Sequence, residues 1–179
     1  MADSQKYFFL NMQPNVNGGS PKASHLNWLE LDNWDFSMNQ TADPNVKGGR
    51  PSKTSATGRF GFTIVHNGPQ LFNLCASGQY ISTPITFEAE RSGLAGVPAA
   101  GASTSNATAT GASSTVVYLQ LIFTNTVVSH RSLSGDDGQK MEHIELVFQK
   151  VQMTYWPVVA GNLGSANTKT YDAKSNLIA

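Results

Sequence analysis

Residues 142–157, EHIELVFQKVQMTYWP, alternate apolar and polar side chains, and this pattern predicts a half-buried β-strand. The apolar set changes face halfway along, after an odd step of three residues: Ile144, Leu146 and Phe148, then Val151, Met153 and Tyr155. An odd step turns the remaining side chains to the opposite face, as a β-bulge does. We therefore expect a long strand in a sheet that bends sharply, as sheets do at the corners of barrels.

Residues 28–38, WLELDNWDFSM, repeat this pattern near the start of the chain. The apolar positions are Leu29 and Leu31, then, after another step of three, Trp34, Phe36 and Met38. The spacing predicts one strand with a bulge in its middle.

Further short alternating segments are separated by Gly, Pro, Asn and Ser clusters, so the sequence is typical of a mainly β protein. The expected strands cover residues 7–12, 60–64, 85–89 and 117–128, with a weaker pattern at 169–178. A single helix is expected over residues 69–77. Pro69 suits its first position and Gly78 suits the residue after its end. Its apolar stripe would be Leu71, Phe72, Leu74 and Cys75, covering an end or flank of the barrel.

Two stretches are expected to be loops within one domain spanning residues 1–179. Residues 41–59 contain several glycines and prolines and no apolar residue larger than Val46. In residues 92–115, 20 of the 24 residues are Ala, Ser, Gly or Thr. Such a segment buries too little apolar area to offset its ordering entropy, so we expect a mobile insertion between two hairpin strands.

Charged residues make up only 13% of the chain, and the 12 basic residues balance the 12 acidic ones. This balance argues against a polybasic nucleic-acid-binding protein. Polarity comes instead from Ser, Thr and Asn, and such a surface repels its own copies weakly. No apolar stretch reaches membrane-spanning length, and the first residues lack the pattern of a signal peptide. We expect a chain that folds in the cytoplasm and inserts into no membrane.

No arrangement of residues indicates catalysis, a cofactor or a metal ion. Glu88 and Glu90 share one face of a strand, with a spacing near that of glycosidase carboxylates, yet we expect them on a solvated polar face. None of the four histidines pairs with another at ligand spacing. Cys75 stands alone on the expected helix stripe, where a buried structural thiol is the simpler interpretation.

Several segments together resemble the haemolysin-coregulated protein (Hcp) family, the tube proteins of the bacterial type VI secretion system. The segments are residues 28–38, residues 71–78 (LFNLCASG) before Tyr80, residues 127–132 (VVSHRS) and residues 142–157. Their order and spacing match the family from Tyr7 to Pro157, whereas an insertion at 92–115 replaces a short hairpin turn. The resemblance therefore covers most of the chain.

The resemblance implies a β-barrel of two packed sheets with one short α-helix, six copies of which form a ring. Rings stack into a tube that a contractile sheath drives, behind a spike protein, into a target cell. Effector proteins can ride in the ring lumen, and the protein leaves the cell through the apparatus itself. The implied function is structural, with no enzymatic turnover.

The resemblance also suggests which residues meet these partners. Asp35 and Ser37 would face the lumen and its cargo, because they alternate with the apolar positions of residues 28–38. The long loop would contact a neighbouring subunit or the next ring, through Lys47, Gly48, Gly49, Arg50, Lys53 and Arg59.

Two other classes remain open from the sequence. A phage tail tube protein would share the barrel and the ring. A monomeric β-sandwich binding module would need an exposed aromatic platform, whereas Trp28, Trp34 and Trp156 are better placed in a core or an interface.

Overall fold

The computed structural model describes residues 6–40, 56–65, 68–92, 115–136, 139–159, 162–173 and 177–178. Most of them lie in β-strands, joined by a 3-10 turn (Ala23–His25) and one α-helix, α1 (Gln70–Ser77). The strands are β1 (Lys6–Asn11), β2 (Leu29–Glu30), β3 (Asn33–Gln40), β4 (Ala56–Val65), β5 (Ile85–Ser92), β6 (Thr115–Asp136), β7 (Gln139–Tyr155), β8 (Val158–Val159), β9 (Asn162–Leu163), β10 (Asn167–Asp172) and β11 (Leu177–Ile178).

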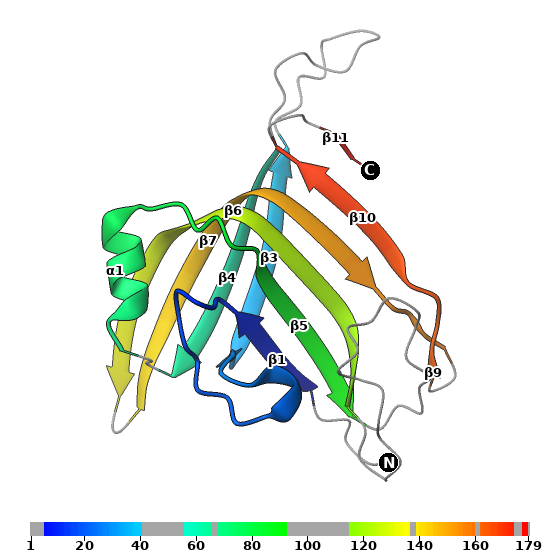
Figure 1. The fold of residues 1–179 in the computed structure, drawn as a ribbon, viewed down its shortest axis with the longest axis horizontal. Helices are drawn as coiled ribbons and strands as arrows, with labels where there is room; N and C mark the ends of the chain where they lie inside the picture. Colours follow the sequence, from blue (N-terminus) through cyan, green and yellow to red (C-terminus); the bar gives the residue numbers. More distant parts are fainter. Residues whose placement is uncertain are drawn as a thin grey trace, which may run out of the picture.

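Nine of the described strands form one hydrogen-bonded sheet that curls around a common core, while β8 and β9 form a small second sheet (Figure 1). The connection between β2 and β3 joins the two sides of the curled sheet, β1 on one side and β4 on the other. The N–H of Leu31 donates to the carbonyl of Phe8 in β1, and the N–H of Asp32 donates to that of Thr63 in β4, both at 2.9 Å. The predicted mainly β barrel with one α-helix is confirmed.

The prediction of a single bulged strand over residues 28–38 is wrong, because the chain forms two strands with different partners. Leu29 and Glu30 of β2 pair with β1. From Asn33 onward, β3 pairs with β4. The odd step between Leu31 and Trp34 therefore marks the place where the chain leaves one side of the barrel for the other.

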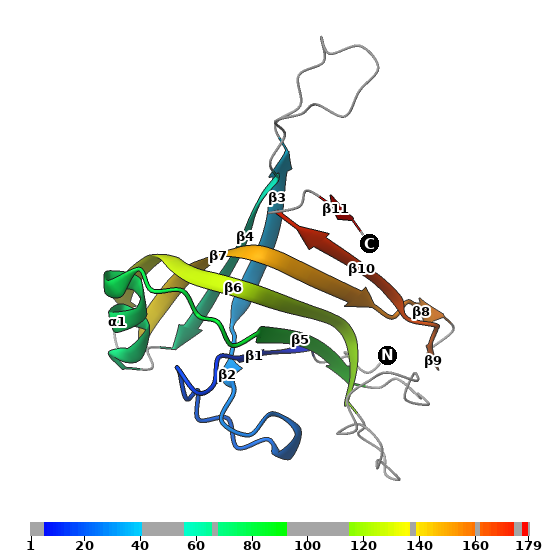
Figure 2. The same ribbon diagram turned by 45° about the horizontal axis from the view of Figure 1, so that its top comes forward.

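The second change of face is confirmed, and it coincides with a change of partner in β7. Residues 141–147 pair with β4 and residues 150–155 pair with β10, while β6 lies along the other side of β7 (Figure 2). The buried positions of β7 step by three from Phe148 to Val151, and those of β6 step by three from Phe123 to Thr126. Between the latter two, Asn125 has a φ of 51°.

Both strands slip together at this point, so their register is the same on either side: Phe123 faces Val151 and Thr126 faces Phe148. The register shift between β6 and β7 falls farther along, between Val128 and His130. The bend in the sheet therefore comes from two matched irregularities rather than from a bulge in one strand.

The core is built from inward side chains of β1 to β7 and of α1, many of them aromatic. The ring centroids of Phe60 lie 5.0 Å from those of both Phe87 and Phe123, and Phe123 lies 4.9 Å from Phe148. These separations suit tilted aromatic pairs, which stabilise beyond simple area burial. The alternations at 60–64 and 85–89 are confirmed as buried strand positions.

Helix α1 packs beside β6 and is followed, as predicted, by Gly78, whose φ of 58° is left-handed (Figure 1). Pro69 is the residue before the helix rather than its first residue. Leu71 is fully buried, whereas the ring of Phe72 is 54% exposed beneath the guanidinium of Arg131. The expected four-residue apolar stripe is therefore wrong at Phe72.

β5 and β6 are antiparallel partners from Ile85–Phe123 to Ser92–Thr115, which confirms the predicted hairpin. Residues 93–114, most of the expected insertion, lie outside the described residues. The weak pattern at 169–178 becomes two strands, β10 and β11, which pair with each other.

Candidate assembly and cargo surface

One outer face of the barrel is formed by β3, β4, the first half of β7 and the second half of β6. One residue of each strand lies in a single row across this face. Asp35 faces Gly61, Gly61 faces Glu145, and Glu145 faces His130. Asp35 therefore stands at one edge of the row and His130 at the other.

Arg59 links the two carboxylates of the row. Its Nη1 donates to Glu145 Oε1 at 2.7 Å, and its Nη2 lies 3.4 Å from Asp35 Oδ2. The side chains of Arg59 and Asp35 are about half exposed, at 46% and 51%. Exposed ion pairs of this kind contribute about 0–1 kcal/mol to stability, so they order the face more than they hold the barrel together.

Gly61 leaves the space that Asp35 occupies. A Cβ at position 61 would lie 2.2 Å from Asp35 Oδ1, so the carboxylate rests directly on the glycine backbone. The sequence placed Asp35 and Ser37 on the polar outer face, opposite Trp34 and Phe36, and both tryptophan and phenylalanine do pack on the core. The role of Asp35 and Ser37 toward cargo stays a prediction.

His143 extends the polar face beside Glu145. Its Nδ1 is 3.3 Å from the hydroxyl of Thr63, and its Nε2 is 3.6 Å from Glu145 Oε1. The ring of His130 lies 6.4 Å from that of His143. In the described part of the chain, no three metal-ligating side chains come close enough to hold an ion.

Of the six residues assigned to ring contacts, only Arg59 lies in the described part of the chain. Lys47, Gly48, Gly49, Arg50 and Lys53 fall outside it. The expected loop boundary at Arg59 is wrong, because β4 begins at Ala56 and Arg59 already pairs with Val147 of β7. Arg59 thus contacts Asp35, a residue that the sequence had assigned to the separate cargo group.

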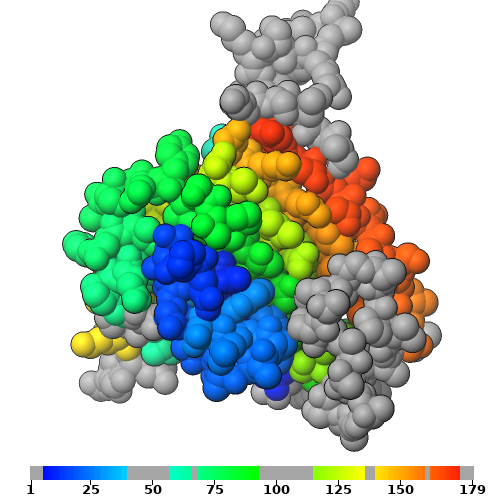
Figure 3. All heavy atoms as spheres, in the orientation of Figure 1, coloured from blue at the N-terminus to red at the C-terminus, as the bar shows by residue number. Residues whose placement is uncertain are grey.

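The largest departure from expectation concerns Glu88 and Glu90, which are only 4% and 1% exposed. Residues 13–28, which we call the strap, lie over the outer face of β1 and β5 and form part of the molecular surface (Figure 3, blue). The strap carries the imidazole of His25 onto the ring of Phe9, with centroids 4.2 Å apart. The expected solvated face is therefore covered.

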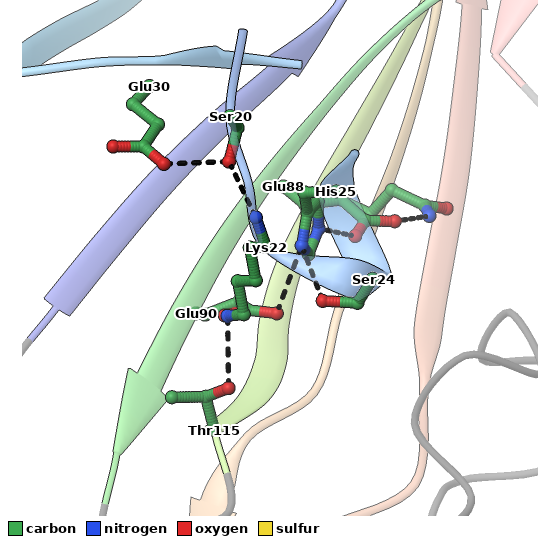
Figure 4. A network of polar contacts seen from close by, with 9 residues as sticks. Ser20, Lys22, Ser24, His25, Glu30, Glu88, Glu90 and Thr115 are labelled. Carbon is green, nitrogen blue, oxygen red and sulfur yellow. Dashed lines mark hydrogen bonds and ion pairs between the residues drawn. The ribbon is translucent and has the colours of Figure 1, made fainter. Parts of the chain in front are cut away.

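Beneath the strap the two glutamates are paired on several sides (Figure 4). Glu88 accepts a 2.7 Å hydrogen bond from the amide of Gln120, and its other oxygen lies 2.8 Å from His25 Nε2. Glu90 pairs with the ammonium of Lys22 and lies 3.6 Å from His25 Nδ1. These pairs satisfy charges that burial would otherwise strongly disfavour.

This buried cluster joins residues 63 and 68 positions apart, so no local motif could predict it. A weak signal was present, since Lys22 and His25 sit three residues apart in a stretch bounded by turn residues. The cluster fixes the strap on β5, whereas the row of Asp35 lies on β3, β4, β7 and β6. It is a structural feature rather than part of the candidate surface.

The family model described as "Type VI secretion system effector, Hcp" matches residues 9–155. The crystal structure of Hcp1 from Salmonella typhimurium is 26% identical, with a TM-score of 0.69 over 97% of this chain and 99% of that chain. Hcp2 of the same organism is 21% identical, with a TM-score of 0.59 over 96% and 98%. A type VI secretion system effector from Yersinia pestis is 19% identical, with a TM-score of 0.61 over 92% and 98%.

The last two likenesses are below 25% identity and show the fold alone. A search of curated proteins gave no match. None of the helices in the described ranges is long and apolar enough to cross a membrane.

Proposed function

The chain belongs to the Hcp family of the type VI secretion system, and we propose that its copies join edge to edge into a ring of six that stacks into the secretion tube. The protein is a tube component of that system. The ring, its stacking and its cargo are the finer parts of the proposal. The free strand edges of the barrel support the ring.

The supporting observation is a pair of unpaired edges on opposite sides of one four-stranded segment. Among the described strands, β3 pairs only with β4, so its other edge has no strand partner. Beyond the bridge between Thr126 and Ile81, the second half of β6 likewise has no strand on the side away from β7. Strand direction alternates along β3, β4, β7 and β6.

A second copy can therefore add its β3 antiparallel to β6 of the first. This contact is head-to-tail, so repetition closes a ring when the rotation between copies is right. Closure would bury strand edges that otherwise promote aggregation. The edges of β3 and β6 carry few charged side chains that would prevent such pairing in the free chain.

In the proposed ring the row of Asp35 lines the lumen. The face is polar, with half-exposed charges that largely compensate one another, and so it would bind effectors weakly and reversibly. Asp35 and Ser37 would contact that cargo. Stacking would use Lys47, Gly48, Gly49, Arg50 and Lys53, and the spike and the contractile sheath would meet the tube from outside.

The proposed role is mechanical, with export through the apparatus itself and no enzymatic turnover. The described part of the face carries partly exposed ion pairs, from Arg59 to Asp35 and to Glu145. A binding and structural function needs no more than this.

Light scattering after size exclusion tests the ring directly. Six chains of 19.2 kDa should give about 115 kDa. The measurement should be repeated over a hundredfold dilution, since a closed ring dissociates to free chains without populating longer open assemblies. A single 19.2 kDa species at micromolar concentration would contradict the proposal and favour a monomeric binding module.

A further inference from the structure

We propose that Asp35 of one subunit meets His130 of its neighbour, and that this contact fixes the register between subunits. The inference rests on the proposed ring, and it names the residues that face each other where β3 of one copy adjoins β6 of the next. It concerns the outer face that carries the row, at the two ends of that row.

The row supplies the geometry. Asp35, Gly61, Glu145 and His130 occupy the same level on four neighbouring strands. Adjacent strands lie about 4.8 Å apart, and directly opposite residues bring their Cβ atoms within about 5 Å. Where a copied β3 adjoins β6 at this level, its Asp35 lies directly opposite His130.

Charge selects this register over its neighbours. The outward side chains of β3 are Asn33, Asp35, Ser37 and Asn39, and those of β6 between residues 130 and 135 are His130, Ser132 and Ser134. Among these side chains, Asp35 is the only acid and His130 the only base. A shift of two residues either way would place each beside a neutral side chain.

Both groups are available for this contact. Asp35 is half exposed, and its partner Arg59 binds Glu145 more closely, at 2.7 Å against 3.4 Å. His130 is exposed, and an imidazole N–H donates to a carboxylate whether the ring is neutral or protonated. Arg131, the next residue, pairs instead with the buried Glu142 and so belongs to the other face.

A cysteine pair tests the contact. Asp35→Cys combined with His130→Cys should form a disulfide between chains, giving a ladder of covalent oligomers up to the hexamer on non-reducing gels. The same two positions cannot join within a chain. They are three strand spacings apart, about 14 Å, whereas a disulfide needs Cα atoms within about 7 Å.

Matched variants make the result specific. Each single cysteine variant controls for Cys75, and Asn33→Cys or Ser37→Cys with His130→Cys tests the neighbouring registers. Faster cross-linking from position 33 or 37 than from 35 would overturn the inference. A 115 kDa assembly that does not cross-link through Asp35→Cys would overturn it while leaving the proposed ring standing.

Charge exchange gives a second readout that needs no cysteine. Asp35→Asn or His130→Gln should weaken the ring about tenfold in dissociation constant, the usual effect of losing a charge-assisted hydrogen bond. Asp35→His with His130→Asp should restore most of that loss. Equal stability of all four proteins would contradict the contact, and a monomeric parent protein would contradict the ring itself.

Discussion

His25 Nε2 lies 2.8 Å from Glu88 Oε2, and both side chains are almost completely buried. The contact joins the strap to β5 across 63 positions of sequence. The other imidazole nitrogen lies 2.9 Å from the Ser24 hydroxyl and 3.6 Å from Glu90. One imidazole therefore contacts two buried carboxylates, and together with the Lys22–Glu90 pair it ties the strap to β5.

His25→Ala should lower the free energy of unfolding by about 3–5 kcal/mol, because the buried Glu88 carboxylate loses one of its two partners and the missing ring leaves a cavity over Phe9. Urea denaturation followed by tryptophan fluorescence measures the loss. Glu88→Gln in the same background removes the unpaired charge and should recover part of it. The exposed neighbour Leu26 supplies the control, since Leu26→Ala should change stability by less than about 0.5 kcal/mol.

Gly58 should tolerate a methyl group poorly. A Cβ at this position would lie 2.2 Å from Cζ of Phe148, a buried ring stacked 6.0 Å from Phe36. Gly58→Ala should therefore cost about 1–3 kcal/mol through overpacking. Gly61→Ala is the matched control, because its Cβ meets the exposed Asp35 carboxylate, which can swing away. Equal losses of thermal midpoint in the two variants would contradict this account.

The two apolar residues at the start of α1, Leu71 and Phe72, should differ sharply in how much they contribute to stability. Leu71 is 1% exposed, and Leu71→Ala should cost about 2–5 kcal/mol by leaving a cavity. Phe72 is 54% exposed, and Phe72→Ala should cost only about 1 kcal/mol, mostly its contact with Arg131. Chemical denaturation of the two variants measures the difference, which a fully buried Phe72 would abolish.

Burial raises the pKa of the Tyr118 phenol above its ordinary value of 10.0; Arg91 opposes this shift, and Tyr155 adds to it. The folded chain therefore holds the phenol proton more tightly than the unfolded chain does. The stability from this group is complete below pH 10 and is lost as pH rises through the folded pKa. Urea midpoints between about pH 9 and 11 should fall less steeply for Tyr118→Phe.

The barrel strands were predictable because a half-buried strand must alternate, and most inward positions of β4, β5 and β7 do so. Helix α1 was predictable from its ends, where Pro69 and Gly78 impose local backbone conformations. Phe72 escaped prediction because spacing gives a helix its apolar stripe, whereas the packing of α1 against β6 decides which members of the stripe are buried.

Features that depend on contacts between distant residues could not be predicted from the sequence. An odd step in a strand means either a bulge or a change of partner, and the residues at 28–38 do not distinguish the two. Glu88 and Glu90 appeared solvated because nothing nearby in sequence pairs with them, and the strap supplies its charges from 63 to 68 residues away.

The candidate surface was predictable in its facing but not in its pairing. Alternation placed Asp35 and Ser37 outward, as the structure has them. That Arg59 would bridge Asp35 and Glu145 depends on the order β3, β4, β7, which brings together three strands far apart in sequence. Register of this kind follows from the pairing of strands across the sheet, and single-strand patterns carry no record of it.

The matched slips of β6 and β7 make the lengths of the two strands interdependent. Phe123 faces Val151 and Thr126 faces Phe148, so the two strands have the same number of residues between these pairs, where the sheet bends. Deleting Gln149 alone would remove the slip from β7, because Phe148 and Val151 would then be two residues apart, while β6 kept its own slip. Deleting Asn125 together with Gln149 would remove the slip from both strands and keep the cross-strand partners. Insertions and deletions here should therefore be tolerated better when both strands change by the same number of residues.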